Sequence, residues 1–185
     1  MIHNIIALLA DGFEETEALV PVDLLRRMGD KVTLVSIKED DLKVTSAHNI
    51  SVVADEHISN IEIGDIDVVI LPGGMPGTKN LDNDKNVHKI IEVLYEQGKL
   101  VTAICAAPMI LGKKGMLVGR NATCFPGFEN DLKGATVLKQ HAVTDGNIIT
   151  AKGAGAAIEF GLAIVEYLHG EEAAEKLAQT IQFII

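Results

Sequence analysis

Short apolar runs alternate along the chain with longer stretches in which apolar residues recur every three or four positions. The runs are rich in Val, Ile and Leu, and they lie at residues 2–10, 31–37, 66–71, 100–105 and 148–151. Such runs are typical of parallel strands buried on both faces of a sheet, and the stretches between them are typical of amphipathic helices. This alternation predicts an α/β fold in which right-handed crossovers join mostly parallel strands.

The first predicted helix, residues 13–29, has acids in its first turn, arginines in its last turn and a closing glycine. Pro21 lies inside it and should bend it. After a polar turn at residues 39–41, short β-type runs at 42–45 and 50–53 predict a hairpin with His48 at its tip. Further helices are predicted at residues 87–97, 106–114, 157–168 and 171–183, and weaker β-type runs at 122–129, 135–138 and 141–143.

Composition and charge narrow the class of protein. A chain of 185 residues can bury a sizeable core, and we expect one domain over residues 1–185. Because 48% of the residues are hydrophobic and 4% are aromatic, this core must be largely aliphatic. The net charge of −10 and a pI near 5.0 argue against a nucleic-acid or anionic-membrane partner, which would need a basic face.

Targeting signals and cysteines bear on the location of the protein. No apolar stretch reaches the roughly 18 residues that span a bilayer, so we expect no membrane role. The first residues lack the charged region, apolar run and cleavage site of a signal peptide, and the only cysteines are Cys105 and Cys124. We therefore expect a cytoplasmic protein with reduced thiols.

Cys105 stands where a predicted strand gives way to a predicted helix. In an open α/β fold this corner lies at the carboxyl edge of the sheet, where such folds place their sites. The free N–H groups and the dipole of a helix that starts there would lower the pKa of the thiol. A free cysteine is also an ordinary small apolar core residue, so position alone leaves both a nucleophile and a core residue open.

Acidic residues and glycines flank the same sheet edge. Glu17 shares a face with apolar residues of the first helix and should point inward, whereas Glu14 and Glu15 should stabilise the helix N-terminus. An inward carboxylate needs a partner, and Cys105 would lie close enough to supply one. Gly73-Gly74 follows another predicted strand, where its backbone can approach a ligand and stabilise an oxyanion; an ordinary tight turn is the alternative.

Together these residues resemble the ThiJ/PfpI superfamily, in particular the branch of the Parkinson disease protein 7 and its bacterial relatives. The resemblance covers nearly the whole chain and rests on four stretches: Glu14-Glu15-Thr16-Glu17-Ala18, Val69-Ile70-Leu71-Pro72-Gly73-Gly74, Ala103-Ile104-Cys105-Ala106-Ala107-Pro108 and residues 154–164. It implies a flavodoxin-like, doubly wound sandwich with helices on both faces of a mostly parallel sheet, assembled as a homodimer. It also implies that Cys105 lies at a nucleophile elbow, hydrogen-bonded to Glu17, with an oxyanion site formed by the backbone of Gly73, Gly74 and Ala106.

One position departs from the family pattern. Many relatives carry a histidine near the cysteine, in the turn where this chain has Phe125. We therefore expect neither a Cys–His pair nor peptidase activity, which needs a base to activate the nucleophile and to protonate a poor leaving group. The loop of His48 resembles a segment near the dimer interface of relatives, so His48 is a candidate for substrate contact across the dimer; a solvated surface residue is the alternative.

The resemblance implies an enzyme that acts on small reactive carbonyls, either a glyoxalase without glutathione or a deglycase of methylglyoxal adducts, with no metal or organic cofactor. Cys105 would add to the aldehyde, and Glu17 would move a proton through an enediolate. The alternatives are a redox-responsive protein or chaperone in which Cys105 is oxidised, and a scaffold with a vestigial site. For the pair we predict a Cys105 thiolate and a protonated Glu17 at neutral pH.

Overall fold

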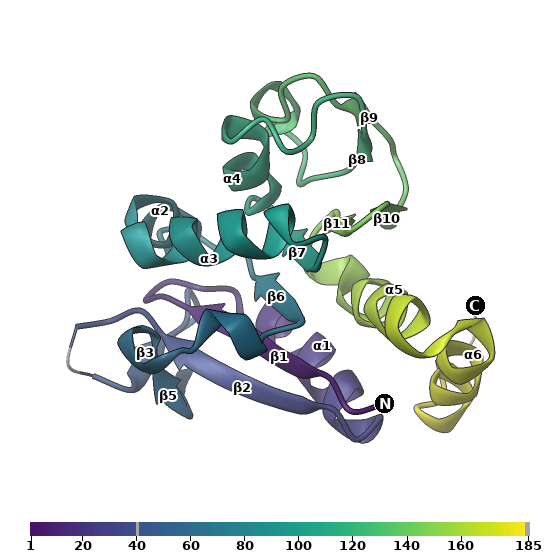
Figure 1. Ribbon diagram of the computed structural model, residues 1–185, viewed down its shortest axis with the longest axis horizontal. Coiled ribbons are helices and arrows are strands. Elements are labelled where there is room, and N and C mark those ends of the chain that lie inside the picture. The colour runs from purple at the N-terminus through teal and green to yellow at the C-terminus, as the bar shows by residue number, and fades with distance from the viewer. Residues whose placement is uncertain (40, 184–185) are drawn as a thin grey trace.

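The computed structural model describes residues 1–39 and 41–183. A seven-stranded sheet forms its centre, with the strand order β10-β11-β7-β6-β1-β2-β5 (Figure 1). Neighbouring strands run parallel except β10 and β11, which pair antiparallel at one edge. The strands are β1 (Asn4–Leu9), β2 (Lys31–Ser36), β5 (Glu56–His57), β6 (Val68–Leu71), β7 (Leu100–Ile104), β10 (Ala142–Asp145) and β11 (Ile148–Ala151).

Helices cover both faces of this sheet (Figure 1). The side chains of β1 show why the apolar runs are continuous, since Ile5, Ala7 and Leu9 are buried on one face and Ile6 and Leu8 on the other. This double burial confirms the predicted α/β sandwich. One face is covered by α1 (Glu15–Arg27), α5 (Ala157–His169) and α6 (Glu171–Thr180), and the other by α2 (Gly77–Asn83), α3 (Lys85–Glu96) and α4 (Pro108–Lys113).

The excursions from the sheet are short. The predicted hairpin is present as β3 (Lys43–Thr45), which pairs antiparallel with β4 (Ser51–Val53). Of the turn predicted before it, Asp40 lies outside the described residues. β8 (Asn121–Ala122) and β9 (Thr136–Val137) pair with each other and stay outside the central sheet. Within the described part of the chain, no helix is both long and apolar enough to cross a membrane.

Two helices differ from the sequence prediction. No helix is predicted between residues 71 and 87, yet α2 forms there, with Thr78 and Leu81 buried although its glycine, asparagines and aspartate favour helices poorly. The helix predicted to start at residue 106 starts at Pro108 and has six residues. Residues 105–107 form a turn instead.

The carboxyl ends of β1, β6 and β7 lie next to one another, because these strands are neighbours and run in the same direction. The chain order reverses between β1 and β6, since β2 lies on one side of β1 and β6 on the other. Open α/β sheets place ligands outside the carboxyl ends at such a switch point. The segments that leave these three strand ends carry Glu17, Gly73-Gly74 and Cys105.

Candidate active site

Cys105 lies in the turn directly after β7. Its φ is +66°, in the left-handed region that residues other than glycine rarely adopt. Its N–H donates to the carbonyl of Ala151 at 2.9 Å, and its carbonyl accepts from the N–H of Phe125 at 2.8 Å. A conformation of this kind costs about 1–3 kcal/mol and occurs mostly at functional sites. The turn is therefore a sharp elbow, held by its neighbours, that presents the thiol at the sheet edge.

Glu17 lies in the first turn of α1 and points inward, with 1% of its surface exposed. The carboxylate of Glu14 caps the helix by accepting a hydrogen bond from the Glu17 N–H at 2.7 Å. Glu17 Oε2 itself accepts a hydrogen bond from the Gly73 N–H at 2.9 Å. The helix and the loop after β6 thus hold the carboxyl group in one orientation.

Gly73 lies between the side chains of Glu17 and Cys105. A Cβ at this position would lie 2.5 Å from Glu17 Oε2, 2.6 Å from Cys105 Cβ and 3.0 Å from Cys105 Sγ, so only glycine fits. Since the sulfur and the carboxylate both lie so close to one point, they are well within the roughly 7 Å of a direct or water-bridged contact. The two side chains are close enough for each to shift the pKa of the other. The structure therefore brings these three residues together.

Burial controls the protonation of the pair. It raises the pKa of Glu17 to about 7, although the hydrogen bond from Cys105 and the N–H groups of Gly73 and Ala154 act to lower it. Burial also raises the pKa of the Cys105 thiol, and the charge of Glu17 adds to the rise, which brings it to about 12. Between these two values the pair holds one proton, which the sulfur and the carboxyl group share.

Burial thus raises the pKa of both groups, and the arrangement of a Cys105 thiolate beside a protonated Glu17 stays a prediction. The helix that was expected to lower the pKa of the thiol starts only at Pro108 and is short. The N–H groups of Gly74 and Ala106 do lower this pKa, but burial and Glu17 outweigh them. The site is thus a cysteine and a carboxyl group that share one proton near neutral pH.

The three glycine and alanine amides have different partners. The N–H groups of Gly74 and Ala106 lower the pKa of the Cys105 thiol, whereas the Gly73 N–H donates a hydrogen bond to Glu17. Gly74 has a φ of +87°, and a Cβ there would lie 2.5 Å from the backbone nitrogen of Glu14. Two amides therefore surround the sulfur, and the third orients the carboxylate.

Within the described residues, no histidine contacts the side chains of Cys105 and Glu17 by a hydrogen bond. All six histidines of the chain have hydrogen-bond partners other than Cys105 and Glu17. His48 Nδ1 lies 3.0 Å from Glu15 Oε1, and its side chain is 67% exposed. Its contact with substrate across a dimer stays a prediction. The base beside Cys105 is therefore the carboxylate of Glu17.

The second cysteine differs from the first. Cys124 is buried. Burial raises the pKa of its thiol to about 11, and the charges of Glu129 and Asp131 add to the rise. Because Cys124 is more buried than Cys105, we expect it to take no part in the chemistry of the site.

A cavity of about 370 Å³ lies next to the pair. Gly153 lies between this cavity and Glu17, because a Cβ at Gly153 would lie 3.1 Å from the ring of Phe125 and 3.9 Å from Glu17 Oε1. Two basic side chains, His141 and Lys152, also line it. The sequence pattern does not indicate that His141 or Lys152 lines a site. In this region it indicates only close backbone packing at the glycines 153 and 155. The other lining residues are Pro126, Ala154, Gly155 and Ala156.

A sequence model of the DJ-1/PfpI family matches residues 3–167. The chain belongs to the DJ-1/PfpI family. One relative, a deglycase from Pyrococcus abyssi (strain GE5 / Orsay), is 31% identical over 151 residues, which cover 80% of this chain and 89% of that protein. Among solved DJ-1 structures, Toxoplasma gondii DJ-1, described as oxidized, has a TM-score of 0.94 and 31% sequence identity and covers 99% of this chain and 100% of its own.

A plant member of the DJ-1/PfpI family is longer. Protein DJ-1 homolog B of Arabidopsis thaliana is 39% identical over 172 residues, which cover 92% of this chain but 39% of that protein. This chain therefore spans less than half the length of that relative.

Proposed function

We propose that this protein is a cysteine-dependent enzyme that acts on small reactive carbonyls, with α-oxoaldehydes such as methylglyoxal, or their early adducts on amines, as its substrate class. The observation that carries the proposal is the Cys105–Glu17 pair, in which a cysteine lies beside a buried carboxyl group with a pKa of about 7. A base whose pKa lies near the working pH moves protons most effectively. The deglycase relative supports the same substrate class.

In the first step, Cys105 Sγ forms a bond to the aldehyde carbon while its proton passes to Glu17. The aldehyde oxygen becomes negatively charged, and the N–H groups of Gly74 and Ala106, already beside the sulfur, stabilise it. Glu17 then returns the proton to this oxygen. The result is a neutral hemithioacetal on Cys105 next to a Glu17 carboxylate.

In the second step, Glu17 removes the proton from the former aldehyde carbon, which gives an enediolate, and this proton exchanges with solvent before Glu17 protonates the neighbouring carbon. The hydroxyl proton of the hemithioacetal passes to the former ketone oxygen. This carbon was the ketone and becomes the alcohol, so oxidation of one carbon balances reduction of the other. The product is a thioester of a 2-hydroxy acid on Cys105. Water cleaves the thioester, releases the hydroxy acid and restores the thiol. Glutathione is not required, because Cys105 supplies the sulfur.

The cavity beside the pair suits a small substrate. Its volume of about 370 Å³ lies at the lower end of the roughly 300–1,000 Å³ of small-molecule sites. Phe125 and Gly153 form an apolar wall next to Glu17, and Lys152 adds a positive charge at the rim. A three-carbon α-oxoaldehyde fits this space, and the 2-hydroxy acid product would be attracted to the lysine.

One observation favours a second function, that of a redox-responsive protein. Peroxide could oxidise Cys105 to a sulfinate, which the N–H groups of Gly74 and Ala106 and a protonated Glu17 would stabilise by hydrogen bonds. The structural neighbour from Toxoplasma gondii is described as oxidized. Oxidation of the sulfur uses Glu17 only as a hydrogen-bond donor, whereas the carbonyl reaction uses a carboxyl group with a pKa near 7 as an acid and a base. We therefore place it second.

We also propose that the protein is a homodimer. The β3–β4 hairpin projects from the sheet and exposes Ile50 and Val53, which a symmetric partner could cover. His48 lies in the same hairpin and would then be close to the partner. Sedimentation at micromolar concentration tests this assembly, and a monomer there would contradict it.

A panel of α-oxoaldehydes and simple aldehydes, incubated without glutathione, tests the proposed activity. We expect each chain to convert many equivalents of methylglyoxal to hydroxy acid, Cys105→Ser to be inactive, and Cys124→Ser to keep the wild-type rate. Loss of at most one equivalent, together with oxidation of Cys105 by peroxide, would favour the redox function. Equal activity of wild type and Cys105→Ser would contradict both.

A further inference from the structure

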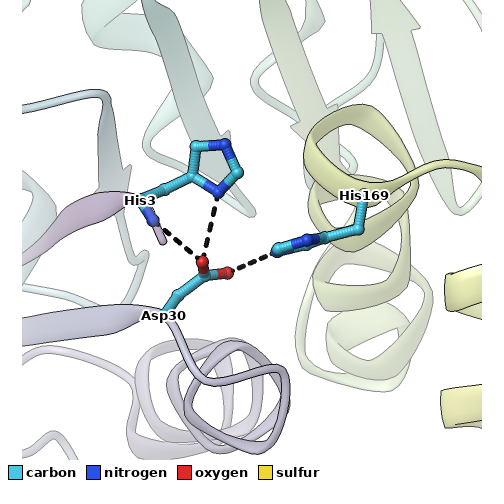
Figure 2. Close-up of side chains that lie close together, drawn as sticks. All are labelled: His3, Asp30 and His169. Carbon is cyan, nitrogen blue, oxygen red and sulfur yellow. Dashed lines mark hydrogen bonds and ion pairs between the residues drawn. The ribbon is translucent and has the colours of Figure 1, made fainter. Parts of the chain in front are cut away.

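Two histidines and an aspartate from distant parts of the chain meet at the sheet edge opposite Cys105. His3 precedes β1, Asp30 lies in the turn between α1 and β2, and His169 is the last residue of α5. Figure 2 shows both rings pointing at the carboxylate of Asp30. His3 Nδ1 lies 3.1 Å from Asp30 Oδ1, and His169 Nε2 lies 2.7 Å from Asp30 Oδ2.

The spacing of the three side chains resembles that of metal ligands. One ligand atom from each of His3, Asp30 and His169 lies within 4.8 Å of the other two, and neighbouring ligands of a tetrahedral zinc ion lie about 3.3 Å apart. The imidazole rings stand nearly perpendicular, at 79°, with their centroids 5.0 Å apart. They therefore approach the carboxylate from two directions without stacking on each other.

Backbone hydrogen bonds hold the three segments in place. The His3 carbonyl accepts from the Lys31 N–H at 3.0 Å, and the His3 N–H donates to Asp30 Oδ1 at 3.0 Å. The Asp30 N–H donates to the Leu25 carbonyl at 3.2 Å. These backbone bonds hold His3 and Asp30 next to β2 and α1, and His169 belongs to α5. Ligand side chains that are already held in place reduce the free-energy cost of binding an ion.

The charge of Asp30 is the second reason to expect a cation. Its side chain is 0% exposed, against 15% for His3 and 14% for His169. Within the described residues, no lysine or arginine forms an ion pair with it. A buried carboxylate requires a compensating charge or a full set of hydrogen bonds, and its side-chain partners here are two of the commonest metal-ligating groups in proteins.

We propose that His3, Asp30 and His169 form a binding site for a late first-row divalent cation such as Zn²⁺. Two imidazoles and one carboxylate suit zinc, cobalt, nickel or copper better than calcium or magnesium, which prefer oxygen ligands. In the complex, His3 Nδ1 and His169 Nε2 direct lone pairs at the ion, and each neutral ring carries its proton on its other nitrogen. Water completes the coordination shell.

Space for this water exists on the solvent side of His169. A cavity of about 660 Å³ is lined there by His169, Met28, Glu172 and Lys176. Arg27 also lines this cavity and pairs with Asp23, and Glu172 and Lys176 carry opposite charges, so these four groups together neither strongly attract nor repel a cation. The ion would tie β1, the start of β2 and the end of α5 together, and its role is structural because Cys105 lies at the other end of the parallel strands.

The test uses the full-length, untagged chain after treatment with EDTA and dialysis. Calorimetric titration with Zn²⁺ and with Co²⁺ should show one equivalent bound per chain. At a metal concentration one hundred times the dissociation constant, the melting temperature should rise by about 5–10 °C. Cys105→Ser should give the same Co²⁺ spectrum as wild type, because the thiol is not a ligand.

Three variants decide whether this site holds the metal. His169→Gln and Asp30→Asn should lose binding of one equivalent and the rise in melting temperature, whereas His141→Gln should keep both. His141 is a matched control, since its Nδ1 pairs with the carboxylate of Glu159 at 2.7 Å on the surface. If Asp30→Asn fails to fold, His3→Gln is used instead. This variant keeps the backbone N–H that donates to Asp30 Oδ1 and loses only the imidazole ligand. Absence of binding at about 100 µM metal, or unchanged binding by His169→Gln, would overturn the proposal and leave a hydrogen-bonded clamp.

Discussion

Replacement of Glu17 by glutamine should stabilise the protein at alkaline pH while removing the base of the site. The pKa of Glu17 is about 7 in the folded chain against an ordinary value of 4.5. Well below pH 4.5 the carboxyl group is therefore protonated in both the folded and the unfolded chain, and its ionisation does not lower the free energy of unfolding. As the pH rises, the unfolded chain loses this proton first, and the wild-type free energy of unfolding falls until the pH exceeds about 7. A pKa difference of one corresponds to about 1.4 kcal/mol.

The variant has no ionisable group at this position, and its side-chain oxygen can still accept the hydrogen bond from the Gly73 N–H. Between pH 5 and pH 8, the difference in unfolding free energy between Glu17→Gln and wild type should therefore shift by about 2.5 kcal/mol in favour of the variant. Urea unfolding of both proteins at the two pH values and one protein concentration measures this shift.

A matched control is Glu92→Gln. Lys114 lowers the pKa of Glu92 by a hydrogen bond at the surface, so this carboxylate is largely ionised over the same pH range in both states. Its difference from wild type should change little between pH 5 and pH 8. If Glu17→Gln shows no larger shift than Glu92→Gln, Glu17 is not a buried carboxyl group with a raised pKa, and the reasoning about the base fails.

Further predictions concern the reactivity and packing of the site. The rate of Cys105 alkylation by iodoacetamide should rise with pH through an apparent pKa of about 7 that belongs to the pair. Glu17→Gln should lose this step, and a profile that is unchanged in the variant would show that Glu17 does not influence the thiol. Gly73→Ala should lower carbonyl turnover by about 10²-fold and destabilise the fold by about 1–3 kcal/mol, because its Cβ would lie 2.5 Å from Glu17 Oε2. The control Gly64→Ala, where no atom lies within 4 Å of the added Cβ, should leave turnover and the urea midpoint near wild type, and equal effects of the two substitutions would contradict the packing argument.

The sheet and the location of the site could be predicted because their signals are local. A continuous apolar run such as β1 indicates burial on both faces, and the strand that ends at Cys105 indicates a corner at the carboxyl edge. The inward orientation of Glu17 follows from helical spacing alone, and the structure confirms it.

The burial of the Cys105–Glu17 pair and the backbone conformation of Cys105 could not be predicted, because both depend on distant parts of the chain. The left-handed conformation of Cys105 is held by hydrogen bonds to Ala151 and Phe125, and these displace the helix start to Pro108. Burial by surrounding elements then outweighs the amides that would favour a thiolate. The meeting of His3, Asp30 and His169 is equally invisible in the sequence, since three separate elements bring them together.

The most direct test of the central claim, that Cys105 and Glu17 act together on a carbonyl substrate, is methylglyoxal turnover in D₂O without glutathione, followed by NMR of the product. The enediolate route predicts many equivalents of lactate per chain, with deuterium on the carbon that bears the hydroxyl group. It also predicts no lactate from Cys105→Ser and a rate about 10²-fold lower for Glu17→Gln. Lactate without deuterium, full activity of Glu17→Gln, or no more than one equivalent of substrate consumed per chain would contradict this account.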